Sequence, residues 1–153
     1  ATRQDSVHKG LKAIDEQGLT CNYVSIHDAA RCLITPKVID ESILACLDCD
    51  GAIVAEPVRD TLKKVNHTTI LKTVSRENLW AMQTPQVFKF PLIFKAYQNA
   101  YKKGLKATDD AQLAEFEGGS IQVVRGDVSN IKITYPEDMT FAETLLKSRY
   151  EID

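Results

Sequence analysis

Helical and strand-like spacings of apolar residues alternate along the first third of the chain. Apolar side chains three or four positions apart predict a helix from Ser6 to about Glu16, with Gly18 as its stop signal. Residues 22–27 alternate polar and apolar side chains and contain many β-formers, which predicts a strand. The apolar side of the helix is expected to consist of Val7, Leu11 and Ile14.

A second helix and a second strand follow in the same order. Thr35 and Pro36 form a typical N-cap and first-turn pair, which predicts a helix from about Pro36 to Cys49. The apolar run 51–55 predicts a strand that is buried on both faces. This order of elements predicts a parallel sheet with right-handed crossovers. The expected buried side of the helix consists of Val38, Ile39, Ile43 and Leu44.

The middle of the chain departs from this rhythm. Residues 58–65 and 69–74 are β-branched and polar, and they flank the turn formers Asn66 and His67. We therefore predict a β-hairpin. Because a two-stranded ribbon with so little core of its own is marginal in water, we expect it to form an arm that reaches another subunit.

The last third of the chain contains further elements of both kinds. Residues 79–88 mix apolar anchors with a turn, and a helix is predicted over 91–103, ending at Gly104. Thr108 is expected to cap the next helix, with two aspartates at its positive end. The remaining predicted elements are strands over 121–124 and 130–133 and a last helix from about Thr134 through Leu146, with Thr134 and Glu137 as a capping box.

Composition places the chain among globular proteins of one domain. Its 153 residues are 44% hydrophobic and 26% charged, which suffices to bury a core. The net charge of −2 gives no support for a nucleic-acid surface, and no apolar run approaches the ~20 residues that span a membrane. The first residues lack the apolar core of a signal peptide, so the expected location is the cytoplasm.

The four cysteines, at positions 21, 32, 46 and 49, do not form the paired pattern of a zinc site. Cys46 and Cys49 make a CxxC pair, for which redox or zinc chemistry is the alternative interpretation. The pair falls at the end of a predicted helix, where the helix dipole disfavours a thiolate. We therefore expect reduced, structural thiols.

The pentapeptide His27-Asp28-Ala29-Ala30-Arg31 carries the strongest functional signal, because it directly follows a predicted strand. Open α/β sheets bind ligands beyond the carboxyl ends of their strands. Asp28 and Arg31 supply an acid and a base at that position, and the two small alanines would let a ligand approach the backbone. The alternative is an ordinary loop with a solvated ion pair.

Other polar residues also occur at the ends of predicted elements rather than along helix faces. Four cations together with hydroxyl groups suit a ligand that is rich in phosphate. Each of these residues, taken singly, has the alternative of being an ordinary surface residue. The set consists of Arg3, Ser6, Asp28, Arg31, Arg76, Thr84, Thr108 and Lys132.

Six short motifs contain these residues and occur in a fixed order. They are Arg3-Gln4-Asp5-Ser6-Val7, the pentapeptide 27–31, Pro57-Val58-Arg59-Asp60-Thr61, Leu79-Trp80 with Thr84-Pro85-Gln86, Thr108-Asp109-Asp110-Ala111, and Asn130-Ile131-Lys132. Together they resemble the 2-C-methyl-D-erythritol 4-phosphate cytidylyltransferases over essentially the whole chain. The resemblance implies an α/β fold with a Rossmann-like, mostly parallel sheet of the nucleotidyltransferase, glycosyltransferase-A-like class. Residues 1–153 are then a partial nucleotidyltransferase domain with a dimerisation arm at about 58–76.

The family that the chain resembles joins CTP to methylerythritol phosphate in isoprenoid precursor biosynthesis, giving 4-diphosphocytidyl-2-C-methyl-D-erythritol and pyrophosphate. The substrate phosphate attacks the α-phosphorus in line, so catalysis is mostly positioning and charge neutralisation. The resemblance also implies a homodimer and Mg²⁺ as cofactor. The metal is expected to be held mainly by the phosphates of CTP, with Asp28 as a candidate ligand.

The resemblance assigns a role to each site residue by matching motif. Arg3, Ser6, Ala29 and Lys132 are expected to bind the nucleotide. Asp28, Arg31, Thr84 and Thr108 are expected to bind the sugar phosphate, and Thr61 and Arg76 on the arm complete this site in the partner subunit. Among these residues, Lys132 is expected to orient the attacking phosphate, with Arg76 and Asp28 as further catalytic candidates.

The chain departs from the family pattern in two places. Cys32 stands where the family usually has proline, which is expected to change loop stiffness more than chemistry. The family also begins with a strand and a glycine-rich phosphate loop that have no counterpart here. We expect roughly two βα units, on the order of 60 residues or more, to be missing, and little or no activity from the 153 residues alone.

Two other functions stay open on the sequence. A ribitol 5-phosphate cytidylyltransferase would have a similar site, although Arg76 and residues 79–86 look closer to the methylerythritol enzymes. A non-catalytic dimerisation or binding module would keep the arm and half of a sugar-phosphate pocket.

Overall fold

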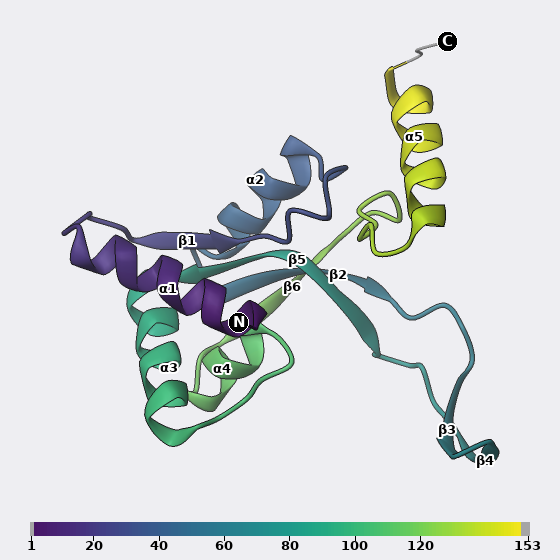
Figure 1. Ribbon diagram of the computed structural model, residues 1–153, viewed down its shortest axis with the longest axis horizontal. Coiled ribbons are helices and arrows are strands. Elements are labelled where there is room, and N and C mark those ends of the chain that lie inside the picture. The colour runs from purple at the N-terminus through teal and green to yellow at the C-terminus, as the bar shows by residue number, and fades with distance from the viewer. Residues whose placement is uncertain (1, 151–153) are drawn as a thin grey trace.

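A four-stranded sheet forms the centre of the structure, a computed structural model that describes residues 2–150 (Figure 1). The strands lie in the order β1-β5-β2-β6. Helices cover both faces of this sheet, and a separate two-stranded arm projects from one end (Figure 1). The strand bounds are Tyr23–Ile26 for β1, Gly51–Pro57 for β2, Trp80–Lys89 for β5 and Ile121–Arg125 for β6.

Strand β5 makes the sheet mixed. It pairs antiparallel with both β1 and β2, whereas β2 and β6 pair parallel. The prediction of a parallel sheet is therefore correct in that β1, β2 and β6 run in the same direction. It is wrong in that the antiparallel β5 lies between β1 and β2. The turn predicted within 79–88 is also wrong. Pro85 lies in the strand opposite a register shift between Ile53 and Ala55, and an irregular position of this kind tolerates a residue without an N–H group.

The helices lie on the two faces of the sheet and beyond its edge. Helices α1, α3 and α4 cover one face, and α2 covers the other (Figure 1). Helix α5 extends away from the sheet (Figure 1). The helices are α1 (Arg3–Glu16), α2 (Pro36–Ala45), α3 (Phe90–Lys103), α4 (Asp110–Phe116) and α5 (Pro136–Tyr150). Among residues 2–150, no helix is long and apolar enough to cross a membrane.

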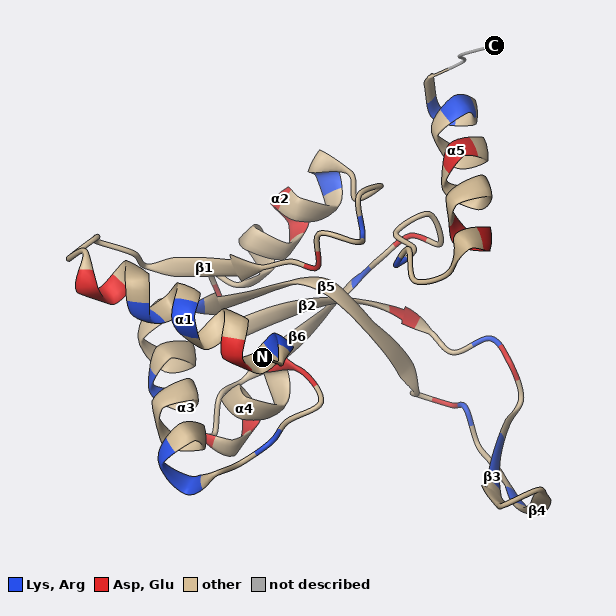
Figure 2. Ribbon diagram, viewed as in Figure 1, with Lys and Arg blue, Asp and Glu red and all other residues tan. Residues whose placement is uncertain are grey.

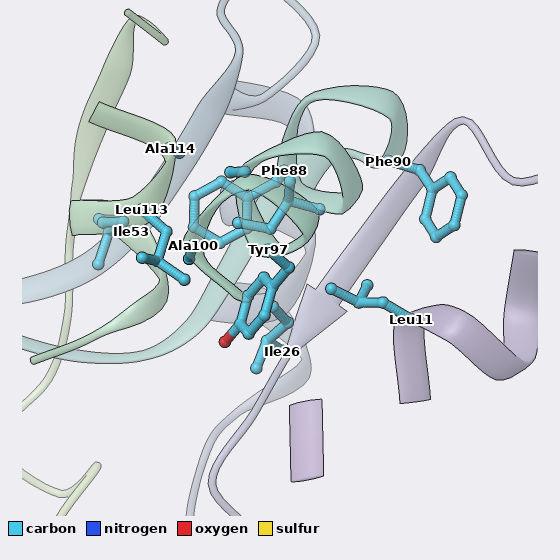
Figure 3. Packing of buried hydrophobic residues seen from close by; sticks show 12 residues of the cluster. Leu11, Ile26, Ile53, Phe88, Phe90, Tyr97, Ala100, Leu113 and Ala114 are labelled. Carbon is cyan, nitrogen blue, oxygen red and sulfur yellow. The ribbon is translucent and has the colours of Figure 1, made fainter. Parts of the chain in front are cut away.

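The hydrophobic core is divided between the two faces because successive side chains of a strand point in opposite directions. Ile53 and Phe88 belong to the larger cluster, which packs against α1, α3 and α4 (Figure 3). Ala52 and Val87, their neighbours in sequence, belong to the smaller cluster under α2 together with Cys46. Burial raises the pKa of the Cys46 thiol to about 11. Cys46 and Cys49 are both free and buried, as expected of structural thiols.

The first two helices differ from the prediction at one end each. Helix α1 begins at Arg3 rather than Ser6, because Thr2 and Asp5 form a capping box that the apolar spacing does not reveal. Helix α2 is capped by Thr35 as predicted, but it ends at Ala45 instead of continuing to Cys49. Its buried face contains Val38 and Ser42, so the expected burial of Ile43 and Leu44 is wrong.

Three predictions near the C-terminal end are also corrected. The cap of α4 is Asp109 and not Thr108, because the Asp109 carboxylate accepts a hydrogen bond from the Gln112 N–H at 3.0 Å. Residues 130–133 form no strand, because the backbone groups of Asn130 and Ile133 bond to loop residues rather than to a neighbouring strand. Helix α5 starts at Pro136, and its Asp138 replaces the predicted Glu137 as the acceptor for the N–H groups of Thr134 and Tyr135.

The predicted hairpin is confirmed. Strand β3 (Leu62–Asn66) pairs antiparallel with β4 (Thr69–Val74), and His67 in the turn has a positive φ of 51°. The first strand starts later than the predicted Val58, because the N–H of Val58 donates to Leu79 and so belongs to the base of the arm. The helix that ends at Gly104 is confirmed as well, with Gly104 in the left-handed conformation.

A methyl group at Gly51 should destabilise the fold. A Cβ at this position would lie 2.6 Å from Cδ1 of Phe88 and 2.8 Å from Cδ1 of Ile121. We expect Gly51→Ala to lower the free energy of unfolding by about 1–3 kcal/mol, as measured by urea denaturation. Gly10→Ala in α1 is the matched control, since nothing lies within 4 Å, and it should raise stability by about 0.5–1 kcal/mol. Equal effects of the two changes would contradict this account of the packing.

Candidate active site

The loop that follows β1 is held in place by β5. Strand β1 ends at the buried Ile26, and the N–H of Arg31 donates to the Asp28 carbonyl at 2.8 Å, which closes a tight turn. The buried Thr84 of β5 accepts a hydrogen bond from the Asp28 N–H at 3.0 Å, and its Oγ1 also lies 3.0 Å from Nδ1 of His27. One hydroxyl group therefore fixes the start of the loop.

The Asp28 carboxylate is the centre of the site. Its Oδ1 lies 2.9 Å from Nε of Arg3, and its Oδ2 lies 2.9 Å from Nζ of Lys132. Burial by itself raises the pKa of Asp28, but the hydrogen bonds and charges of Lys132 and Arg3 outweigh it and hold the pKa below its ordinary value. The structure thus brings together three predicted site residues from distant parts of the sequence.

Arg3 also contacts a second carboxylate. Its Nη2 lies 2.7 Å from Oδ2 of Asp110, which is fully buried at the start of α4. The other oxygen of Asp110 accepts a hydrogen bond from the hydroxyl of Tyr97. Burial lowers the pKa of Arg3, but its hydrogen bonds and charge interactions with Asp110 and Asp28 raise it above the ordinary value. Arg3 therefore carries its positive charge at any pH at which the protein is folded.

Asn130 attaches the segment before Lys132 to the sheet. Its side-chain amide donates to Oε1 of Gln83 at 2.8 Å and to the Thr84 carbonyl at 2.9 Å. Two further backbone contacts join this segment to the loop after β1. The Asn130 carbonyl accepts from Nη1 of Arg31 at 2.7 Å, and the Ile133 N–H donates to Ala30 at 2.9 Å. These contacts explain how Lys132 reaches Asp28 although residues 130–133 form no strand.

The net shift of the pKa is opposite in Arg31 and Arg3. The pKa of Arg31 is lowered, because burial disfavours the charged form more strongly than the charge of Asp28 favours it. Its Nε is buried and has no hydrogen-bond partner within the described residues. Arg31 therefore keeps donor capacity beyond its bond to the Asn130 carbonyl.

Arg3, Asp28, Lys132 and Asp110 form what we call the Asp28 cluster. The other predicted site residues do not join it. Ala29 is exposed in the same loop, and the Ser6 hydroxyl donates to the Thr2 carbonyl within α1 at 3.3 Å. Thr108 bonds to Gln112 instead, and it lines a cavity of about 40 Å³ next to Arg3 and Asp110. Thr61 and Arg76 flank the arm, where Arg76 donates to the Arg59 carbonyl, and the arm extends away from the rest of the molecule (Figure 1).

Four residues that take part in the hydrogen bonds of the site were not assigned a role from the sequence. His27, Asp110 and Asn130 lie inside the quoted motifs, so their positions carried a signal, but nothing local distinguished them from their neighbours. Tyr97 lies outside every motif, in the middle of α3. Its place in the helix follows the apolar pattern, and only the folded structure reveals that its hydroxyl meets Asp110.

Comparison with known proteins identifies the family of the chain. The model of the family described as IspD, 2-C-methyl-D-erythritol 4-phosphate cytidylyltransferase, matches residues 1–148. The chain belongs to this family. Proteins named 2-C-methyl-D-erythritol 4-phosphate cytidylyltransferase from Alkaliphilus oremlandii and Clostridioides difficile are 45% identical over 150 residues and 44% identical over 144 residues. These matches cover 97% and 94% of this chain but 62% and 60% of the relatives, so the chain spans less than two thirds of their length.

Solved structures of the IspD family have the same fold. The enzyme from Thermus thermophilus is 34% identical and superposes with a TM-score of 0.86, covering 95% of this chain and 70% of that one. The synthase from Anaerococcus prevotii is 35% identical with a TM-score of 0.85, and the match covers 96% of this chain and 67% of the other. The α/β fold with its mixed sheet is therefore that of the family.

The described residues do not form a metal cage. Among residues 2–150, no group of three or more His, Cys, Asp or Glu side chains could hold a metal ion. Asp28 is the expected candidate ligand, but each of its oxygens already faces a cation at 2.9 Å. These donors fit Mg²⁺ only if most of its ligands come from elsewhere, as with the phosphates of a nucleotide.

The low pKa of Asp28 predicts a pH-dependent contribution to stability. We expect Asp28→Asn to lower the free energy of unfolding by about 1 kcal/mol at pH 7, because it removes two charge-assisted contacts that are partly exposed. A lowered pKa stabilises the fold above the unfolded value of about 3.9, and this stabilisation is lost as the pH falls through the folded value. The difference between variant and wild type should therefore shrink below about pH 4.

Urea titrations between pH 2.5 and 7 would measure this effect. Asp48→Asn is the control, since Asp48 is exposed and should show no such loss. A difference for Asp28→Asn that stays constant over the whole range would contradict the assignment.

Proposed function

We propose that the chain is part of an enzyme that transfers a cytidylyl group from CTP to 2-C-methyl-D-erythritol 4-phosphate, releasing pyrophosphate. The observation that carries the proposal is the Asp28 carboxylate held between Arg3 and Lys132 beyond the end of β1. Membership of the IspD family supports it, as do the names of the relatives. Two cations from separate segments, next to a tight loop, suit the joining of two phosphate-bearing substrates.

Each cation has a proposed task. Arg3 binds the nucleotide phosphates through the guanidinium donors that face away from its two carboxylates, with Ser6 and Ala29 nearby in the nucleotide subsite. Lys132 has a side chain that is 46% exposed, and it exchanges Asp28 for the attacking phosphate. Fixed positive charges of this kind stabilise the negative charge that develops during phosphoryl transfer.

The sugar phosphate is assigned to the opposite side of the loop. Arg31 is half-buried and offers the Nη donors that its bond to the Asn130 carbonyl leaves free. Asp28 accepts hydrogen bonds from sugar hydroxyl groups once Lys132 turns to the attacking phosphate, and Thr84 keeps the loop in place. Thr108 is assigned to the rim of this subsite, next to the cavity at Asp110.

Mg²⁺ is proposed as the cofactor, brought by CTP. It would supply charge neutralisation on the triphosphate, and Asp28 is the described carboxylate that lies nearest to both cations of the site. A cytoplasmic location is part of the same proposal, since the four cysteines are free rather than bridged.

The arm is proposed to join two subunits. It exposes Val65, Ile70 and Leu71 by 53–61%, although it makes a sheet of only two strands. Lysines also lie along β3 and β4 (Figure 2). A ribbon of this kind gains stability when a second copy covers its apolar side chains. Thr61 and Arg76 would then complete the sugar-phosphate subsite of the partner subunit.

The catalytic role of Lys132 gives a direct test of the proposed function. In the whole protein, Lys132→Ala should lower kcat about 100-fold while CTP affinity changes less, because one transition-state contact is lost. Pyrophosphate release would be measured with CTP, Mg²⁺ and either methylerythritol 4-phosphate or ribitol 5-phosphate. Lys12→Ala is the control, since Lys12 pairs with the exposed Glu16 at 3.3 Å and should change nothing.

Two outcomes would overturn this proposal. If the wild-type protein prefers ribitol 5-phosphate, its substrate is ribitol 5-phosphate and not methylerythritol 4-phosphate. A Lys132→Ala variant as active as Lys12→Ala would remove the Asp28 cluster from catalysis.

The proposed arm exchange predicts complementation between two inactive variants. Arg76→Ala should impair use of the sugar phosphate, and light scattering should report a dimer at micromolar concentration. If Arg76 acts across the interface, mixing Arg76→Ala and Lys132→Ala subunits restores intact sites in the mixed dimers. Random pairing then gives about a quarter of wild-type activity. No recovery from dimers that exchange subunits would show that Arg76 acts within its own chain, and a monomer would exclude the arrangement.

A further inference from the structure

We infer that Tyr97 is a positioning residue for nucleotide binding, acting through Asp110 on the guanidinium of Arg3. The inference rests on the proposed assignment of Arg3 to the nucleotide. Tyr97 does not touch the proposed ligand. It is 1% exposed in the middle of α3, and its hydroxyl donates to Oδ1 of Asp110.

The two oxygens of Asp110 have separate partners, and this fixes the direction of the carboxylate. Oδ1 accepts from Tyr97, while Oδ2 accepts from Nη2 of Arg3 at 2.7 Å. A carboxylate with one oxygen anchored cannot rotate without breaking that bond. Asp110 is also fully buried, so water does not compete for its oxygens. The position of the Tyr97 hydroxyl therefore determines where Asp110 holds Arg3.

Arg3 is held from two sides, and the rest of its guanidinium is left free. Its Nε donates to Asp28 and one Nη2 hydrogen donates to Asp110. A guanidinium has five N–H donors, so three remain for an anionic ligand. The side chain is 36% exposed, which gives such a ligand access. A donor set that is oriented before binding loses less entropy when the ligand arrives.

The hydrogen bond of the Tyr97 hydroxyl can be removed without removing the packing of the Tyr97 ring in the core. The ring packs in the larger apolar cluster near Leu11 and Ile26, and its oxygen is the single side-chain polar atom among the twelve residues drawn (Figure 3). Phenylalanine would keep these apolar contacts. A cavity of about 40 Å³ borders Tyr97 and Asp110, and loss of the hydroxyl group would extend it, so that one water molecule could then reach Oδ1. Tyr97→Phe should therefore fold while losing the fixed direction of Asp110.

The same helix provides a matched control. Tyr101 lies one turn after Tyr97, and its hydroxyl also donates to a carboxylate, that of Asp5. Asp5 belongs to the capping box of α1, whose first residue is Arg3, but the ion pairs of the Arg3 guanidinium among the described residues are with Asp28 and Asp110. Tyr101→Phe removes a hydrogen bond of the same type without touching the Asp110 pair. Differences between the two variants report the connection to Arg3.

The test compares these variants in the whole protein. We expect Tyr97→Phe to weaken CTP binding by about fivefold, measured by calorimetry with Mg²⁺ and as KM, while kcat changes less than twofold. In ¹⁵N NMR spectra, the Arg3 Nε–H signal should shift or broaden clearly more in Tyr97→Phe than in Tyr101→Phe. Asp110→Asn is the second variant and should disturb the Arg3 signal at least as strongly.

The outcomes separate this inference from the proposed function. If Arg3→Ala weakens CTP binding but Tyr97→Phe alters neither the affinity nor the Arg3 signal, the inference is wrong and the proposed function stands. If Arg3→Ala leaves CTP binding unchanged, the nucleotide assignment of Arg3 fails, and the inference about nucleotide binding fails with it. If Tyr97→Phe and Tyr101→Phe lose CTP affinity equally, the loss reflects lower stability of the fold rather than the position of Arg3, and the inference is overturned.

Discussion

The charge balance around Asp28 is the constraint on which the site depends. Arg3 and Lys132 approach the same carboxylate, and Asp110 supplies a second negative charge to Arg3. The four side chains are neutral as a set, so the two cations stay close together without a ligand. An anionic ligand must therefore displace Asp28 from Lys132, whereas Arg3 can keep both carboxylates and bind the ligand through its remaining donors. This arrangement favours ligands with several phosphate oxygens, because Lys132 needs a replacement partner and Arg3 has several free donors to satisfy.

Strand β5 transmits the geometry of the sheet to this cluster. Its Thr84 holds the loop after β1 and, through its carbonyl, the amide of Asn130. Its Gln86 is buried, accepts from the Ala111 N–H at 3.1 Å and donates to Asp109 at 3.1 Å, which fixes the start of α4. Asp110 lies in that first turn. Three segments that are distant in sequence thus meet on one antiparallel strand, and a shift of this strand would move every charged group of the site.

Predictions that depended on local chemistry were largely correct. Gly104 ends α3, Thr35 caps α2, and the polar β-branched segments around His67 form a hairpin. One helix start was predicted wrongly because a group distant in sequence takes part in it. Thr108 has the side chain of a cap, but Asp109 takes that place while also accepting a hydrogen bond from Gln86 of β5.

The sequence by itself determined the alternating helices and strands, the hairpin and the ordered motifs that contain Arg3, Asp28 and Lys132. These features follow from local spacing and residue type, which the chain displays directly. Only the tertiary structure decided that β5 lies between β1 and β2, that residues 130–133 form a loop, and that Tyr97 meets Asp110. The physical reason is that strand pairing and buried charge contacts join residues far apart in sequence. Their energies depend on which surfaces the whole fold brings together.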